Sequence, residues 1–260
     1  MPTELLVLLS PKNLILFIVV FTRLGGLMTS APLFSTYPIP NQIKVWLIAT
    51  ITFIIFPMIM AKSGFQAPTN MPELTIILLK EFIIGYIIGF VSNLVFVAVE
   101  MAAELISLQM TLTAAQALNP VSGNNTPILS QVYTLMAAMI FLSLHAHQWL
   151  FSAVYQSFQA IPPGYEFVIN GTIVKELIYM TGQMFPISLG IALPIFAVLL
   201  ITEVLLGFIS KMMPQMNIFM VAMPLKIYLG LLLGLMFLQP MYEHISMLIE
   251  QILKAVVGLF

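Results

Sequence analysis

The longest apolar stretch of the sequence, Leu74–Leu108, limits the possible folds more than any other feature. It contains no proline, and as one straight helix it would be about 50 Å long at 1.5 Å per residue. The hydrocarbon core of a bilayer is only ~30 Å thick. We therefore expect that this helix either breaks or projects well beyond the membrane.

The whole sequence is poor in charge, which indicates an integral membrane protein. Of the 260 residues 60% are hydrophobic and 7% are charged, whereas soluble domains carry about 25% charged residues. The net charge of -1 suggests neither a nucleic-acid partner nor a basic membrane-surface helix. The first apolar run has no small-residue cleavage site close behind it, so we expect it to be retained rather than removed as a signal peptide.

Apolar runs separated by proline, glycine and polar residues predict six helical segments. We expect the last two to be interrupted, the fifth at Pro186 and Pro194 and the sixth at Pro224. The residues after Met241 form an amphipathic pattern. The expected segments are Leu14–Leu33, Val45–Ala61, Leu74–Leu108, Ile128–Leu144, Phe185–Ile209 and Ile218–Leu238.

One long hydrophilic connection, 151–176, divides the chain. It separates a unit of four apolar segments, 1–150, from a C-terminal pair followed by the amphipathic helix, 177–260. The sequence therefore predicts an all-α membrane protein with two parts.

Small and polar residues recur at helical spacing along one face of the third segment. At 100° per residue this face holds a set that we call the polar stripe: Gly85, Gly89, Asn93, Glu100, Glu104 and Ser107. A carboxylate facing lipid costs at least ~2.5 kcal/mol, so the stripe must face protein or water. The two glycines have the GxxxG spacing that permits close helix approach. Glu100 and Glu104 either pair with a basic residue of a neighbour for assembly or act directly in a pore or in coupling.

The polar stripe leads into an uncharged segment, 109–127, that is too polar for hydrocarbon and too apolar for an ordinary exposed loop. Such a segment is tolerated at membrane depth only where protein or water surrounds it. We expect it to close a hole lined by protein. The residues that we expect to do so are Gln109, Met110, Thr111, Thr113, Ala114, Ala115, Gln116, Asn119 and Pro120.

Other features point to packing rather than to chemistry. His145 and His147 form a possible metal pair, but a helix-end pair beside Trp149 fits their position better. Gly230 and Gly234 repeat the GxxxG spacing, most simply to pack the C-terminal pair of helices together. The sequence has no cysteine, no aspartate and no motif of a hydrolase, metalloprotease, nucleotide-binding or dinucleotide-binding enzyme, so we expect no enzymatic activity and no cofactor.

Several motifs in a fixed order resemble the FliR family of the flagellar protein-export apparatus, called SctT in the related virulence secretion systems. They are Arg23 with Ala31-Pro32, Pro40 with Lys44, Glu104-Leu-Ile-Ser-Leu-Gln-Met110 with Asn119-Pro120 and Pro127, His147-x-Trp149-Leu150, and Pro214-Gln215-x-Asn217-x-Phe219 with Pro224-x-Lys226. The chain departs from the family, which usually has glycine at the positions of Ser107, Thr111 and Ala222 and aspartate at that of Asn119. Thr is stiffer than Gly, so the departure at Thr111 affects the expected loop conformation.

The resemblance implies a subunit of a protein-export gate in the bacterial inner membrane, within the flagellar basal body. One such chain would join several FliP-like and FliQ-like subunits, beside an FlhB-like subunit, around a pore for unfolded export substrates. It also implies that 1–150 is FliP-like, that 177–260 contains a FliQ-like hairpin and that 109–127 is the plug of the pore. The candidate assembly residues are Arg23, Lys44, Glu203, Lys211, Pro214, Gln215, Asn217 and Lys226.

Three alternatives stay open. The chain could serve a virulence secretion system, or it could be a stand-alone secondary transporter or channel that uses Glu100 and Glu104 for coupling. An intramembrane enzyme is disfavoured because the nucleophile and metal sets are missing. A transporter should purify alone or as a symmetric homo-oligomer, whereas an export-gate subunit should co-purify as the minority component of a larger complex.

Overall fold

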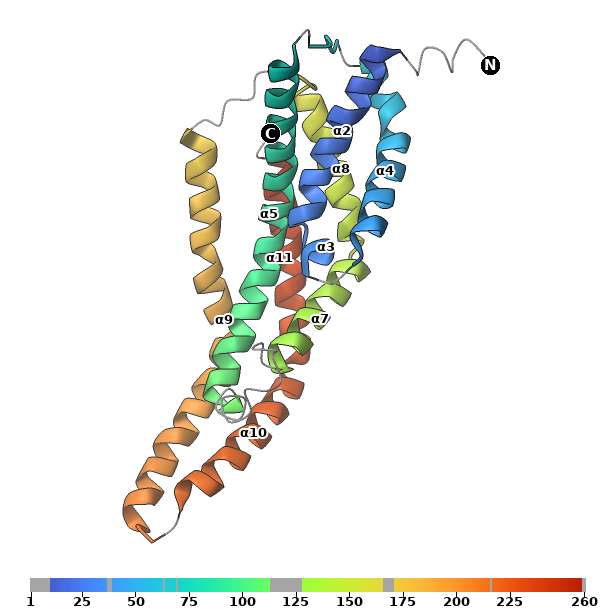
Figure 1. Cartoon of the computed structure of the whole chain (residues 1–260). Helices are drawn as coiled ribbons and strands as arrows, with labels where there is room; N and C mark the ends of the chain where they lie inside the picture. Colours follow the sequence, from blue (N-terminus) through green and yellow to red (C-terminus); the bar gives the residue numbers. More distant parts are fainter. Residues whose placement is uncertain are drawn as a thin grey trace. The chain divides into compact units, whose positions relative to one another are not determined.

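The computed structural model describes residues 10–36, 39–62, 64–68, 70–112, 128–165, 171–215 and 217–258, and the regular structure within them is helical throughout. This confirms the predicted all-α class (Figure 1). The helices are α2 (Pro11–Ser30), α3 (Pro32–Thr36), α4 (Asn41–Lys62), α5 (Met71–Gln109), α7 (Ile128–Ser143), α8 (Ala146–Ala160), α9 (Gly171–Met212), α10 (Ile218–Met236) and α11 (Leu238–Gly258).

The number of membrane-capable helices agrees with the six predicted segments. Four single helices in the described part of the chain, α2, α4, α5 and α9, are long and apolar enough to cross a membrane. Two bent pairs, α7 with α8 and α10 with α11, raise the number to six if each pair counts as one span.

Helix α5 is continuous. Of the two possibilities for the third predicted segment, a broken helix or one that projects beyond the membrane, the second is therefore correct. The helix has 39 residues and begins with Pro72 and Glu73 in its first turn, where a missing N–H and a negative charge are both favourable. At 1.5 Å per residue its length is about 58 Å. The helix therefore extends far beyond the ~30 Å that lipid tails can cover.

The expected interruptions at prolines were wrong. Helix α9 continues for 42 residues through Pro186 and Pro194, and α10 continues through Pro224. Membrane helices tolerate proline because neighbouring groups satisfy the backbone atoms that it leaves unpaired. The bend in the C-terminal region falls instead where α10 meets α11, at 60°.

The chain forms two compact units, which do not follow chain order. The first consists of the described residues of Met1–Leu94, His145–Ile178 and Glu250–Phe260, and the second of those of Val95–Leu144 and Tyr179–Ile249. The division at 151–176 stays a prediction, but the expected loop is partly helical, because α8 extends to Ala160 and α9 begins at Gly171.

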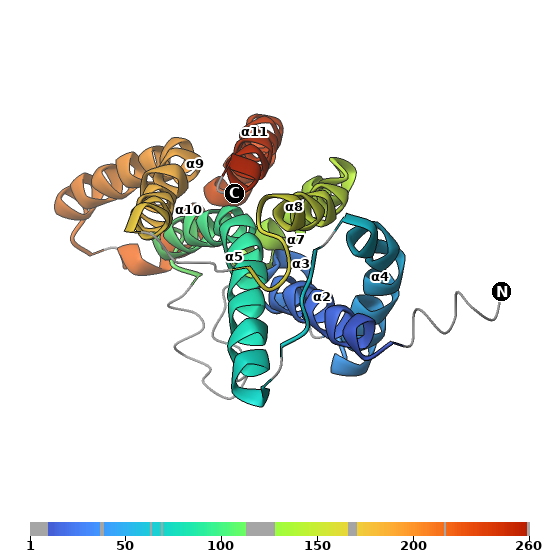
Figure 2. The same ribbon diagram turned by 90° about the horizontal axis from the view of Figure 1, so that it is seen from above.

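In the first unit, α2 packs against both α4 and α5. Helices α2 and α4 lie side by side in both ribbon views (Figure 2), and the rings of Phe17 and Phe56 meet edge to face at 5.7 Å between centroids. A side chain at Gly85 or Gly89 of α5 would collide with the backbone of α2, and one at Gly26 of α2 would collide with that of α5. The close helix approach predicted for Gly85 and Gly89 is thus confirmed.

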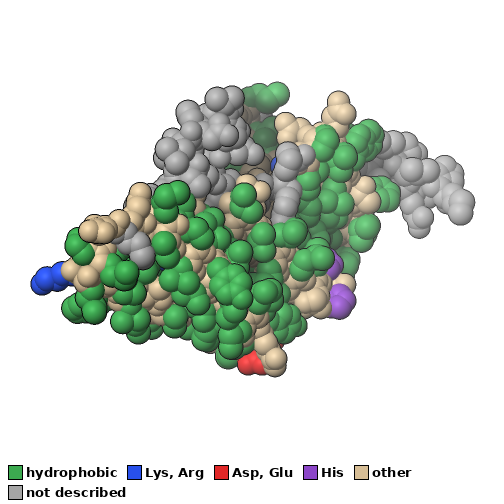
Figure 3. All heavy atoms as spheres, turned by 90° about the horizontal axis from the view of Figure 1, so that it is seen from below, with side chains coloured by type: hydrophobic (Ala, Val, Ile, Leu, Met, Phe, Trp, Pro, Cys, Tyr) green, Lys and Arg blue, Asp and Glu red, His purple; other side chains and the backbone are tan. Residues whose placement is uncertain are grey.

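The second unit contains the end of α5, α7, most of α9, α10 and the first part of α11. The predicted amphipathic face of α11 is confirmed, since Ile245, Leu248 and Ile249 are buried while Glu243 is exposed. The phenyl rings of Phe96 in α5 and Phe141 in α7 meet at 5.7 Å. Figure 3 shows hydrophobic side chains over much of one face of the molecule, as expected for a chain covered by lipid or by other subunits.

Candidate functional site

The end of α5 is docked on the hairpin formed by α9 and α10, all within the second unit. Helix α5 ends at Gln109, whose side-chain Nε2 donates a hydrogen bond of 3.0 Å to Oε2 of Glu203 in α9. The next residue, Met110, is 0% exposed. The first residues of the predicted 109–127 plug are therefore held by the C-terminal hairpin.

Glu203 joins three helices because its Oε2 also accepts from Nζ of Lys226 in α10, at 3.2 Å. The Lys226 side chain is only 6% exposed, whereas that of Glu203 is 59% exposed. A buried ammonium group is unfavourable unless it is paired, so Lys226 needs this carboxylate. The structure thus brings a predicted plug residue, Gln109, together with two predicted assembly residues, Glu203 and Lys226.

Met110 fills space that exists because residue 230 is a glycine. A Cβ added to Gly230 would lie 2.5 Å from both Cγ and Sδ of Met110. One turn further on, a Cβ at Gly234 would lie 3.5 Å from the hydroxyl oxygen of Tyr133 in α7. The expectation that the two glycines pack α10 against α9 was wrong, because they face the end of α5 and α7.

Thr111 adopts a backbone conformation that favours glycine. Its φ is +60°, and its hydroxyl donates to the carbonyl oxygen of Met110 at 2.6 Å. In this left-handed region a Cβ crowds the following carbonyl oxygen, which glycine avoids. The glycine that the resemblance implies at this position would suit this geometry, and Thr111 adopts it with a local hydrogen bond.

The lower half of the polar stripe has mixed surroundings. Ser107 is buried and donates to the carbonyl oxygen of Ala103 at 2.7 Å, Asn93 and Glu100 are half-buried, and Glu104 is exposed. In the part of the chain that the structure describes, no ion pair involves Glu100 or Glu104. Their pairing with a neighbouring subunit stays a prediction.

The first unit contains a buried charge centre, of which the sequence pointed to Arg23 but not to its partner Glu81. Nε of Arg23 in α2 donates to Oε2 of Glu81 in α5 at 2.5 Å. Nη1 donates to Oγ of Ser157 at 3.0 Å, and Nη2 donates to the carbonyl oxygen of Ile161 at 3.1 Å. The guanidinium carbon lies 3.8 Å from the ring centroid of Phe158. Glu81 could have been found, because it precedes Gly85 by four residues and extends the polar stripe.

Arg23 is 0% exposed, so its guanidinium is enclosed by this chain. Lys226 is also buried, whereas the remaining assembly candidates lie nearer the surface. Lys44 is half-buried in the first turn of α4, Glu203 is exposed, and Lys211, Pro214, Gln215 and Asn217 are exposed at the hairpin turn. Six predicted plug residues lie outside the described residues: Thr113, Ala114, Ala115, Gln116, Asn119 and Pro120.

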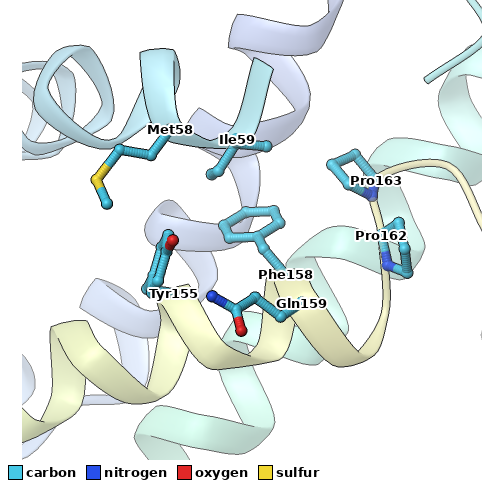
Figure 4. A pocket seen from close by; sticks show the side chains of 7 residues that line it. All are labelled: Met58, Ile59, Tyr155, Phe158, Gln159, Pro162 and Pro163. Atoms are coloured by element: carbon cyan, nitrogen blue, oxygen red, sulfur yellow. The ribbon is translucent and has the colours of Figure 1, made fainter. Parts of the chain in front are cut away.

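A cavity of about 190 Å³ lies between α4 and α8 (Figure 4). Its polar groups are the phenol of Tyr155 and the amide of Gln159, and no acidic or basic side chain lines it. Within the described ranges no group of three or more His, Cys, Asp or Glu residues is placed to hold a metal ion. The cavity lining is Met58, Ile59, Tyr155, Phe158, Gln159, Pro162 and Pro163.

Comparison with known proteins gives a consistent result over nearly the whole chain. Residues 14–252 match the family described as bacterial export proteins, family 1. The flagellar biosynthetic protein FliR of Escherichia coli K12 is 30% identical over 91% of this chain and 90% of its own length. The corresponding proteins of Pectobacterium carotovorum and Bacillus subtilis are 30% and 28% identical over 86% and 81% of this chain, and over the same shares of their own lengths. The chain therefore belongs to family 1 of the bacterial export proteins, the family of the FliR proteins.

Proposed function

We propose that this chain is a core subunit of the flagellar protein-export gate in the bacterial inner membrane. Its family membership and its apolar helices support this role. The relatives described above are named as flagellar proteins, which favours the flagellum over a virulence secretion system. In this proposal the chain assembles with FliP-like and FliQ-like subunits, next to an FlhB-like subunit, around a pore for unfolded flagellar proteins.

In this proposal, different parts of the chain have different roles. The 1–150 part acts as a FliP-like unit, and the hairpin of α9 and α10 acts as a FliQ-like pair. The 109–127 segment plugs the pore and prevents leakage of ions and water when no substrate is present. The segment carries no charge, so it would not retain substrate residues of either sign.

One observation supports the plug most directly. The segment begins at a fixed site, where Gln109 is bonded to Glu203 and Met110 is fully buried beside Gly230. A plug must return to the same place after each substrate, and an anchored start restricts where the following residues can reach. The unfavourable burial of the Lys226 ammonium group also indicates a demand beyond simple membrane packing.

Deletion of 110–122 tests this function. We expect the deletion to raise the ion conductance of the membrane, because the pore would then lack its plug. Conductance is measured in cells that carry the variant in place of the native chain, after co-purification has shown that the complex still assembles. Unchanged leakage from an assembled complex would contradict the plug.

A further inference from the structure

We infer that the hairpin of α9 and α10 is a permanent anchor for the end of α5, and that this contact stays closed while substrate passes. The inference rests on the proposed function and assigns a positioning role to Glu203, Lys226 and Gly230. It divides the predicted plug, 109–127, into a docked part, Gln109–Met110, and a part that begins at Thr111.

The polar half of the anchor joins the end of α5 to an ion pair that lies within the hairpin. Glu203 is the one ion-pair partner of Lys226 among the described residues, and it uses the same Oε2 atom to accept from Gln109. The Lys226 side chain is nearly enclosed, so this ion pair holds the Glu203 carboxylate at a defined place on the hairpin. Opening the contact would break the hydrogen bond from Gln109 and leave the ion pair, so the polar half sets where α5 docks.

The apolar half of the anchor adjoins the polar half. Lys226 and Gly230 are one turn apart on one face of α10. Glu203, which is paired with Lys226, accepts from Gln109, and Gly230 faces the adjacent residue Met110. Withdrawal of Met110, which is 0% exposed, would leave an empty space beside Gly230 and expose its thioether. Because Gln109 and Met110 are adjacent in the chain, withdrawal of the end of α5 would break both contacts.

The backbone shows where docking ends. Residues up to Gln109 are helical, Met110 is enclosed, and Thr111 has a φ of +60° that turns the chain away from the helix direction. Thr111 is half-buried rather than enclosed. The geometry therefore places the limit of the anchor between Met110 and Thr111.

A disulfide lock tests whether the contact opens during export. A Cβ at Gly230 would lie 2.5 Å from Cγ of Met110, so the two Cβ atoms are within about 4 Å of each other, as a disulfide requires. The chain has no cysteine of its own, so Met110→Cys with Gly230→Cys forms a single defined bridge. The double variant replaces the native chain in cells, and secreted flagellar protein is measured under oxidising and reducing conditions.

We expect secretion by the oxidised variant to stay within about twofold of the reduced variant, since the anchor does not need to open. Met110→Cys alone is the control for loss of the methionine. A tenfold loss of secretion on oxidation that is reversed by reduction would overturn the inference.

Loosening the anchor gives a second measurement that does not require a disulfide. Gly230→Ala places a methyl group where the flexible side chain of Met110 lies, and this fully buried side chain would have to shift to make room. Gly234→Ala, one turn away on the same helix, meets only an ordinary contact at 3.5 Å. We expect several-fold higher ion leakage from the assembled complex with Gly230→Ala and no change with Gly234→Ala. Equal leakage from both would count against the anchor.

The two proposals fail in different ways. If deletion of 110–122 does not raise leakage, the plug role of 109–127 is rejected, and the hairpin would have no plug to hold in place. If the deletion raises leakage while Gly230→Ala does not, or while the disulfide lock stops secretion, the plug stands and only the permanent anchor is rejected.

Discussion

At the scale of single residues, the chain retains a buried charge only where several groups satisfy it. Arg23 belongs to an apolar helix, and its side chain is enclosed. Glu81, Ser157 and the carbonyl oxygen of Ile161 accept its hydrogen bonds, and the ring of Phe158 covers the guanidinium. Glu81 in turn accepts from the backbone N–H of Gly164 at 3.4 Å. The centre therefore links α2, α5 and α8 through directed contacts rather than through apolar area alone.

Removal of one member of the Arg23–Glu81 pair should be more harmful than removal of both. Arg23→Met leaves the Glu81 carboxylate buried without its cation, and we expect the free energy of unfolding to fall by ~3–5 kcal/mol. Arg23→Met with Glu81→Leu removes both charges and should recover much of that loss. Unfolding in detergent measures both variants. A double variant less stable than Arg23→Met would contradict this account.

At the scale of elements, glycine decides how closely α2 and α5 approach. Gly26 lies against the α5 backbone at Phe82 and Tyr86, whereas a Cβ at the adjacent Gly25 would meet no atom within 4 Å. The sequence presents Gly25 and Gly26 as an equivalent pair. Only the packing shows that they have different roles.

This difference gives a test with a control in the neighbouring position. Gly26→Ala would force the two helices apart, because backbone atoms cannot move aside as a flexible side chain can. We expect it to lower the free energy of unfolding by about 1–3 kcal/mol, the usual cost of overpacking. Gly25→Ala should leave stability unchanged or raise it slightly, since alanine favours the helix. Unfolding curves of the two variants in detergent check the prediction, and equal effects would refute it.

Element types were predictable from the sequence because long apolar runs and helical spacing act locally. The same local reasoning failed at Pro186, Pro194 and Pro224, where the helices continue through the proline. Membrane helices tolerate proline where neighbouring groups satisfy the freed backbone atoms, which local sequence does not show. It also failed for Gly230 and Gly234, because spacing shows that glycines share a face but not which helix that face meets.

The candidate site was predictable only in part. Gln109, Glu203 and Lys226 were singled out, but their meeting at one carboxylate oxygen depends on contacts between residues 94 positions apart in the sequence. Glu81 was missed although it extends the polar stripe, because its partner Arg23 is 58 positions away. Which distant polar groups pair depends on the tertiary structure, and a single sequence does not show it.

At the scale of the whole molecule, the chain has more apolar surface than a bilayer can cover. Exposed apolar residues recur along α9 between Ile178, 67% exposed, and Met212, 81% exposed. At 1.5 Å per residue this stretch is about 50 Å long, compared with a hydrocarbon core of ~30 Å. The remainder needs cover from other protein, which supports assembly with further subunits.

The same reasoning applies to Glu100 and Glu104, which lie one turn apart on α5 and lack a basic partner among the described residues. An intramembrane carboxylate is retained where a partner compensates for its burial, so we expect a basic residue of another subunit to meet this pair. Replacing both with Gln should then reduce recovery of the complex at least tenfold, measured by co-purification of the proposed FliP-like subunit. Glu243→Gln, on the exposed face of α11, is the control and should leave recovery unchanged. An intact complex with halted export would instead assign the two carboxylates to the pore.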